Sequence, residues 1–172
     1  MKYRLINKDD CIKYRSDIFQ AYQSCRLTFD YRNPYAPKTE EEALDFLIGY
    51  AEDSKDSIVY GLFDDKEDYL YGIVILDNIR ITKDGSCAQV HIVNDKSIFG
   101  KRVRDVYNDL IIACGFNILY AEIPANAVHA IAMCKRMGFK KTGYIPKALP
   151  YKNINGEERM YDLQIFVKEN NK

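Results

Sequence analysis

The sequence lacks the features that would assign it directly to several common classes. Lys plus Arg number 25 and Asp plus Glu number 25, so the formal net charge is zero and no overall field favours nucleic acid or an anionic membrane. Only two histidines are present, which excludes a mechanism that needs a histidine cluster. No uncharged apolar run reaches about 18 residues. We therefore expect neither a nucleic-acid partner nor a membrane.

The five cysteines are widely spaced and form no CxxC pair. An odd number without such pairs fits neither a disulfide framework nor a zinc site, so we expect no metal. The first ten residues, MKYRLINKDD, carry charges where a signal peptide needs an apolar core. These observations predict a cytoplasmic protein with reduced thiols.

What is present is an ordinary globular composition in 172 residues, with 47% hydrophobic and 29% charged residues. This length and composition predict a single domain over residues 1–172.

Apolar periodicity gives the order of elements. Period-two runs predict strands over 2–6, 57–63, 69–81, 87–93, 118–123, 139–145 and 159–167. Helical spacing predicts helices over about 9–26, 39–52, 103–115 and 127–138. We expect Asp9 or Asp10 to cap the first helix, and Thr39 with Glu42 to form a capping box at the second.

The resulting order, βααβββαβαββ, is a mixed α/β fold. The strand–helix–strand unit from 87 to 123 implies one parallel pair in an otherwise antiparallel sheet. Parallel strands that splay apart leave a cleft between them, so we expect the site there.

A glycine marks the junction between the strand that ends near 93 and the next helix. Gly100 is followed by Lys101, Arg102 and Arg104. The unpaired backbone N–H groups at a helix start can hold a pyrophosphate, and basic side chains would add to the attraction. A plain helix start with solvated charges explains the same residues.

The element order and this turn resemble the GNAT superfamily of acyl-coenzyme A dependent N-acyltransferases, in particular its divergent phage and prophage members. SIFGKR at 97–102 stands where the family has Q/R-x-x-G-x-G/A, with Ser97 for Gln or Arg and Arg102 for the last small residue. NAVHAIAMCKRMGF at 126–139 is similar to the family's N-x-x-A-x-x-x-Y-x-K-x-G-F, with Cys134 in place of the tyrosine and Asn126 one residue early, where it can still cap the helix.

The resemblance implies a GNAT-like fold with a twisted, mostly antiparallel sheet, and acetyl-coenzyme A as co-substrate. The coenzyme's pantetheine arm should pair with strand backbone near Ile92 and Val93. The full set of residues implied to bind coenzyme A is Ile92, Val93, Ser97, Phe99, Gly100, Lys101, Arg102 and Asn126.

Two residues are candidates for catalysis. His91 alternates with Gln89 and Val93 on the strand that leads into the cleft, and a neutral imidazole there could accept the proton of an incoming ammonium. A hydrogen-bonded core histidine is the other interpretation. Cys134 replaces the tyrosine that protonates the departing thiolate in the family, yet its place on an apolar stripe also fits simple packing. His129 falls on the polar side of its helix.

Two segments would flank the acceptor side of the cleft in such a fold: residues 25–38 and residues 144–158. Asp30, Tyr31 and Tyr144 offer a carboxylate and aromatic faces that suit a cationic or amine-bearing acceptor. Aromatic residues on long loops also mark protein contact sites.

Two functions follow. The first is an N-acetyltransferase that moves acetyl from acetyl-coenzyme A to an amine of a small molecule or protein. The second, suggested by the departures at Ser97, Arg102 and Cys134, is a noncatalytic GNAT-fold structural or host-interaction protein, which would place it in a phage virion. Either function is compatible with an oligomer.

Overall fold

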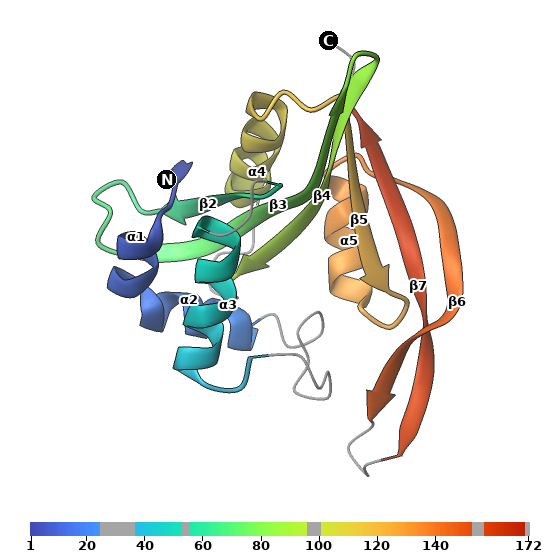
Figure 1. Cartoon of the computed structure of the whole chain (residues 1–172), viewed down its shortest axis with the longest axis horizontal. Coiled ribbons are helices and arrows are strands. Elements are labelled where there is room, and N and C mark those ends of the chain that lie inside the picture. The colour runs from blue at the N-terminus through green and yellow to red at the C-terminus, as the bar shows by residue number, and fades with distance from the viewer. Residues whose placement is uncertain (25–36, 53–55, 96–100, 153–156, 171–172) are drawn as a thin grey trace.

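The computed structural model describes residues 1–24, 37–52, 56–95, 101–152 and 157–170 (Figure 1). Its strands are β1 (Lys2–Leu5), β2 (Ile58–Phe63), β3 (Leu70–Thr82), β4 (Gly85–Asn94), β5 (Ile118–Pro124), β6 (Lys140–Lys152) and β7 (Glu158–Glu169). Its helices are α1 (Lys8–Lys13), α2 (Arg15–Ser24), α3 (Glu40–Glu52), α4 (Lys101–Ala113) and α5 (Val128–Arg136). All the predicted strands are confirmed, with small changes at their ends except for β6, which is much longer than predicted.

The strands form one seven-stranded sheet in the order β1-β2-β3-β4-β5-β7-β6. Neighbouring strands are antiparallel except β4 and β5, which run parallel. The crossover between β4 and β5 passes through α4, as a parallel pair requires. The predicted mixed α/β class with one parallel pair is therefore confirmed.

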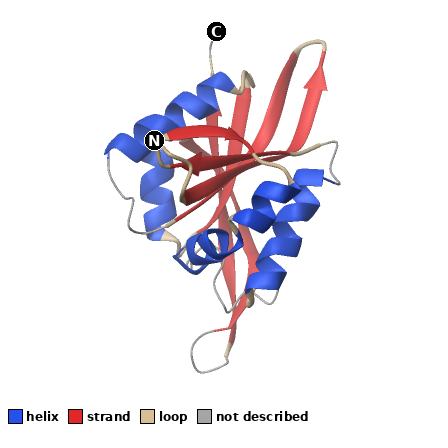
Figure 2. Cartoon of the chain, turned by 90° about the vertical axis from the view of Figure 1, so that its left-hand side faces the viewer, coloured by secondary structure: helices blue, strands red, loops and turns tan. Residues whose placement is uncertain are grey.

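Helices cover both sides of the sheet, as Figure 2 shows. On one side, α1, α2 and α3 bury an apolar cluster that includes Ile18, Leu47, Ile75 and Val93. On the other, α4 and α5 pack on a second cluster with the alternate sheet residues, such as Val90. Because successive strand side chains point to opposite faces, β4 contributes to both clusters.

The prediction of one helix over 9–26 was wrong, because the chain forms two helices separated at Tyr14. The Tyr14 side chain is buried, and its hydroxyl donates a hydrogen bond of 2.6 Å to the carbonyl oxygen of Glu67. The cap also differs from the prediction. Asn7 caps α1 by accepting from the Asp10 N–H at 3.0 Å, while the Asp10 carboxylate accepts from the Asn7 N–H.

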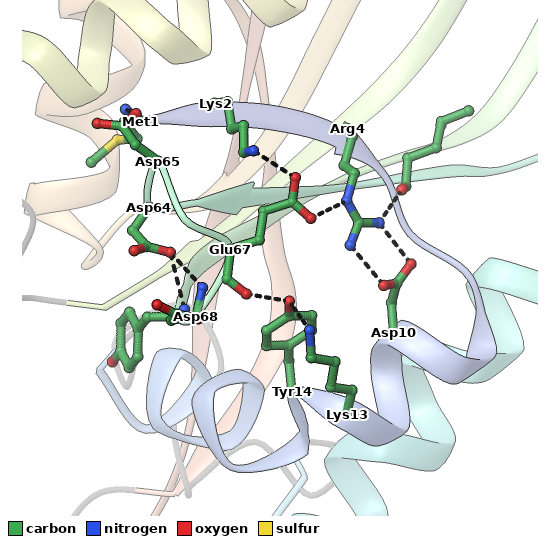
Figure 3. Close-up of polar contacts among 12 residues, drawn as sticks. Met1, Lys2, Arg4, Asp10, Lys13, Tyr14, Asp64, Asp65, Glu67 and Asp68 are labelled. Carbon is green, nitrogen blue, oxygen red and sulfur yellow. Dashed lines mark hydrogen bonds and ion pairs between the residues drawn. The ribbon is translucent and has the colours of Figure 1, made fainter.

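An ion-pair network ties this corner to the β2–β3 turn (Figure 3). The Arg4 guanidinium donates to both oxygens of Asp10 at 2.8 Å and to Glu67 at 3.1 Å. Lys2 contacts Glu67 at 2.8 Å. The network joins β1, α1 and the turn before β3, so it fixes α1 to this edge of the sheet.

Two further boundaries follow local chemistry. Thr39 does cap α3, since its Oγ1 accepts from the Glu42 N–H at 3.1 Å, but the Glu42 carboxylate accepts from Lys38 N–H. Strand β6 extends well past the predicted end near 145, because an irregularity with Lys147 at φ 49° interrupts the ladder and the pairing with β7 then resumes.

Candidate active site

The parallel strands separate partway along their length. Pairing between β4 and β5 is confined to Cys87 through Gln89 on β4, opposite Ile118 through Tyr120 on β5. Beyond that point β4 stays paired with β3, and β5 with β7. The facing edges of β4 and β5 are therefore left without each other as partners. Backbone N–H and C=O groups on such edges suit an extended amide chain.

A pocket of about 80 Å³, open to solvent, lies in this gap. Strand β4 lines it with Val90, His91 and Ile92, and strand β5 lines it with Ala121, Glu122 and Ile123; the remaining lining residues come from α5 and its C-terminal side and are Ala130, Met133, Cys134, Met137 and Phe139. The lining is mostly apolar on the α5 side. A thioester-bearing arm would find apolar contacts there.

The opposite face of the sheet carries polar groups at the same level. His91 lies opposite Ile75, whose side chain packs with the α1–α3 cluster, so the His91 imidazole points to that face. Its Nε2 lies 3.1 Å from Asp77 Oδ1. The two side chains are 30% and 14% exposed, so the pair is sheltered but accessible.

Other residues from α3 and β5 face this pair. The Tyr50 hydroxyl of α3 donates a hydrogen bond to the Asp77 carboxylate, and burial together with the Asp77 charge raises the pKa of Tyr50. Burial raises the pKa of Tyr120 on β5, and the nearby charges of Glu122 and Asp77 raise it further. We call this set (Tyr50, Asp77, His91, Tyr120 and Glu122) the polar cluster.

A β-bulge in β3 shapes the polar cluster. The register between β3 and β4 shifts between Asp77 and Arg80, and Asn78 adopts a left-handed backbone with φ 49°. As a result two consecutive residues serve one face: Asp77 contacts His91, and the Asn78 amide donates to Gln89 Oε1 at 2.8 Å. Bulges of this kind re-aim side chains and are common beside active sites.

Cys134 reaches the same pocket from α5 but differs in character. It is 7% exposed, and burial raises the pKa of its thiol to about 12. The thiol is therefore protonated at neutral pH. This state disfavours attack by a thiolate.

The structure brings some of the predicted residues together and places others elsewhere. Ile92 lines the pocket, while Val93 points into the opposite cluster. Ser97, Phe99, Gly100, Asp30 and Tyr31 lie outside the described residues. Lys101 and Arg102 are the first two residues of α4.

Asn126 does not cap α5, contrary to prediction. The cap residue is Ala127, without a side-chain hydrogen bond, and Asn126 contributes only its carbonyl oxygen to the Val128 N–H. Tyr144 is 62% exposed on β6, and β7 lies between β6 and β5. His129 is exposed, as predicted.

Sequence reasoning missed Tyr50, Asp77 and Glu122. Glu122 is the one charged residue in ILYAEI and falls on the outward positions of its alternation, which is a readable signal. Asp77 reaches His91 only because of the bulge, and Tyr50 reaches Asp77 only because of how α3 packs. Within the described ranges, no group of three or more potential ligands could hold a metal ion, and no helix is long and apolar enough to cross a bilayer.

A mixed sheet whose parallel pair opens into a pocket defines the class of fold. The chain belongs to the family described as the acetyltransferase (GNAT) domain, whose profile matches residues 3–160. No curated protein sequence matches it significantly.

Solved structures are similar over nearly the whole chain. A point mutant of spermidine N-acetyltransferase from Vibrio cholerae superposes with a TM-score of 0.69 at 16% identity, covering 98% of this chain and 95% of that one. Ribosomal-protein-S5-alanine acetyltransferase from Vibrio fischeri gives 0.67 at 20%, covering 98% and 92%. A ribosomal L7/L12 alpha-N-protein acetyltransferase in complex with coenzyme A gives 0.72 at 14%, covering 97% and 92%. Identities this low establish the fold alone.

Proposed function

We propose that this protein transfers an acetyl group from acetyl-coenzyme A to an amine on a small molecule or a protein. The observation that carries the proposal is the opening between β4 and β5, which joins an apolar pocket on the α5 side to the polar cluster on the α3 side. The similar structures act on spermidine and on ribosomal proteins, which supports an amine as the acceptor class.

The pocket fits the pantetheine arm of coenzyme A. Beyond Gln89 the β4 edge at Ile92 and Val93 faces the gap and lacks β5 as a partner, so its backbone would pair with the arm's amides. The apolar side chains of Ala130 and Met133 would contact the arm from α5. The remaining predicted coenzyme contacts, at Ser97, Phe99, Gly100, Lys101, Arg102 and Asn126, stay predictions, as do the acceptor contacts at Asp30, Tyr31 and Tyr144.

The chemistry requires proximity and a proton acceptor. The amine nitrogen forms a bond to the acetyl carbonyl carbon, the carbon–sulfur bond breaks, and the thiolate leaves with the electron pair. His91 would accept the proton that the ammonium must lose. The enzyme needs no nucleophile of its own, because the amine attacks directly once both substrates are held together.

Calorimetry with acetyl-coenzyme A and two matched variants tests the site. Ala130→Leu places a larger side chain on the α5 wall of the pocket, whereas Ala132→Leu changes the same helix at a residue that does not line it. We expect the first variant to weaken binding by at least about tenfold, since overpacking costs about 1–3 kcal/mol, and the second to bind like the wild type. If both variants bind acetyl-coenzyme A equally weakly, or if both bind it like the wild type, the proposed site is contradicted.

Mass spectrometry of an amine panel tests the reaction itself. The panel should include spermidine and a peptide with a free N-terminus, each incubated with acetyl-coenzyme A and the protein. A mass gain of one acetyl group on an amine supports the proposal. Binding of acetyl-coenzyme A without any transfer would instead support the noncatalytic role, in which a phage or virion association is the matching prediction.

A further inference from the structure

We infer that Asp77 is a positioning residue for His91: it holds the imidazole with the proton on Nε2, so that Nδ1 keeps the lone pair that takes the proton from the acceptor amine. Tyr50 holds Asp77 in place. This inference rests on the proposed function, in which His91 is the proton acceptor.

The hydrogen bond between the two side chains carries the argument. His91 Nε2 lies 3.1 Å from Asp77 Oδ1, a normal hydrogen-bond distance. An ionised carboxylate can only accept, so Nε2 must be the donor. In neutral histidine only one ring nitrogen carries a proton. The lone pair is therefore on Nδ1, and the carboxylate stabilises the imidazolium that forms when Nδ1 takes a proton.

The surroundings fix the carboxylate as well as the imidazole. The Tyr50 hydroxyl donates to Asp77 from α3. The bulge sets the position of Asp77 on β3, at the cost of a left-handed backbone at Asn78. Backbone strain of this kind persists where the surrounding structure holds it, and it clusters at functional sites.

The charged and titratable groups facing His91 come from each neighbouring element. They are Asp77 of β3, Tyr50 of α3, and Tyr120 and Glu122 of β5, with Arg80 of β3 and Cys87 of β4 beside Tyr120. The Asp77 carboxylate, in direct contact with His91, and the Glu122 carboxylate favour a transient positive charge there, and the Arg80 guanidinium opposes it.

Nuclear magnetic resonance can read the tautomer directly. A long-range correlation spectrum of ¹⁵N-histidine protein contains only two imidazoles, because the chain has two histidines, and the exposed His129 serves as an internal reference. We expect the neutral His91 ring to show a protonated Nε2 and a bare Nδ1. In Asp77→Asn the side-chain amide can also donate, so the signals should move toward a mixture of both forms.

Steady-state kinetics separate positioning from folding. Asp77→Asn should lower kcat by at least about tenfold and leave the KM for acetyl-coenzyme A within about twofold, the pattern of a lost transition-state interaction. Tyr50→Phe should lower kcat in the same direction by a smaller factor. Asp45→Asn, an exposed carboxylate on the same helix as Tyr50, should leave both constants unchanged.

The outcomes distinguish this inference from the proposed function. An active wild type whose neutral His91 carries its proton on Nδ1, or an Asp77→Asn variant with unchanged kcat, overturns the inference and leaves acetyl transfer standing. A wild type that acetylates no amine overturns the proposed function and the inference with it. The wild-type spectrum decides the tautomer even if Asp77→Asn does not fold.

Discussion

Cys134 occupies the position at which the family resemblance implies an acid, and the structure predicts that its removal barely affects catalysis. Burial raises the pKa of the Cys134 thiol to about 12. An ordinary thiol, such as the leaving group of coenzyme A, titrates near about 8.5. Proton transfer from Cys134 to the departing thiolate is therefore uphill by about three and a half pKa units, or about 5 kcal/mol. A donor this weak contributes little to the rate.

We therefore expect Cys134→Ala to leave kcat within about threefold of wild type and to lower the free energy of unfolding by about 1 kcal/mol, because it removes one buried atom that packs on the core. Single-turnover acetylation followed by mass spectrometry measures the first quantity, and urea unfolding measures the second. A fall in kcat of a hundredfold or more, with unchanged unfolding, would refute this reasoning. Cys134→Ser is the matched control, because it keeps the size of the side chain and places a hydroxyl, the group that the family tyrosine carries, at this position.

Two further predictions follow from the same geometry and from the corner at β1. His91→Ala should lower kcat by about a hundredfold, the usual scale for loss of a general base, whereas His129→Ala should leave kcat unchanged; an equal kcat in the two variants contradicts the role of His91. Asp10→Asn should cost about 1–2 kcal/mol of stability at pH 7. The Arg4 hydrogen bond lowers the pKa of Asp10, so this loss should be full above pH 3.8 and vanish as pH falls through the lower folded value. Urea unfolding of both proteins from pH 7 to pH 2 measures it, and a constant difference argues against the ion pair.

Local patterns were sufficient to predict most of the elements but not where they break. The split between α1 and α2 has no glycine or proline to announce it. It occurs where the buried Tyr14 hydroxyl bonds the Glu67 carbonyl, a contact between residues far apart in sequence. Periodicity records which face of a helix is apolar, and it is blind to a tertiary contact that ends the helix.

The candidate site shows the same limit more sharply. Alternation on β4 was enough to place His91 on the strand beside the gap. Its partner Asp77 depends on a one-residue shift of register in β3, and Tyr50 depends on how α3 docks. Neither the register shift nor the docking of α3 can be predicted from a short segment of sequence, so both required the structure.

The two sides of the gap explain how the departure at Cys134 is compatible with acetyl transfer in the proposed function. Direct attack by an amine involves two proton transfers. The ammonium nitrogen must lose a proton before the bond forms, and the departing sulfur can accept one afterwards. The polar cluster would accept the proton of the ammonium on the α3 side, where Asp77 and Glu122 supply negative charge. The second transfer falls on the α5 side of the pocket, where the departing thiolate, the conjugate base of a thiol that titrates near about 8.5, is a good enough leaving group to depart without a protein acid. Loss of the family tyrosine therefore removes only a proton donor to a thiolate that can leave without one. Loss of the Asp77–His91 pair would instead remove the proton acceptor that makes the amine a nucleophile.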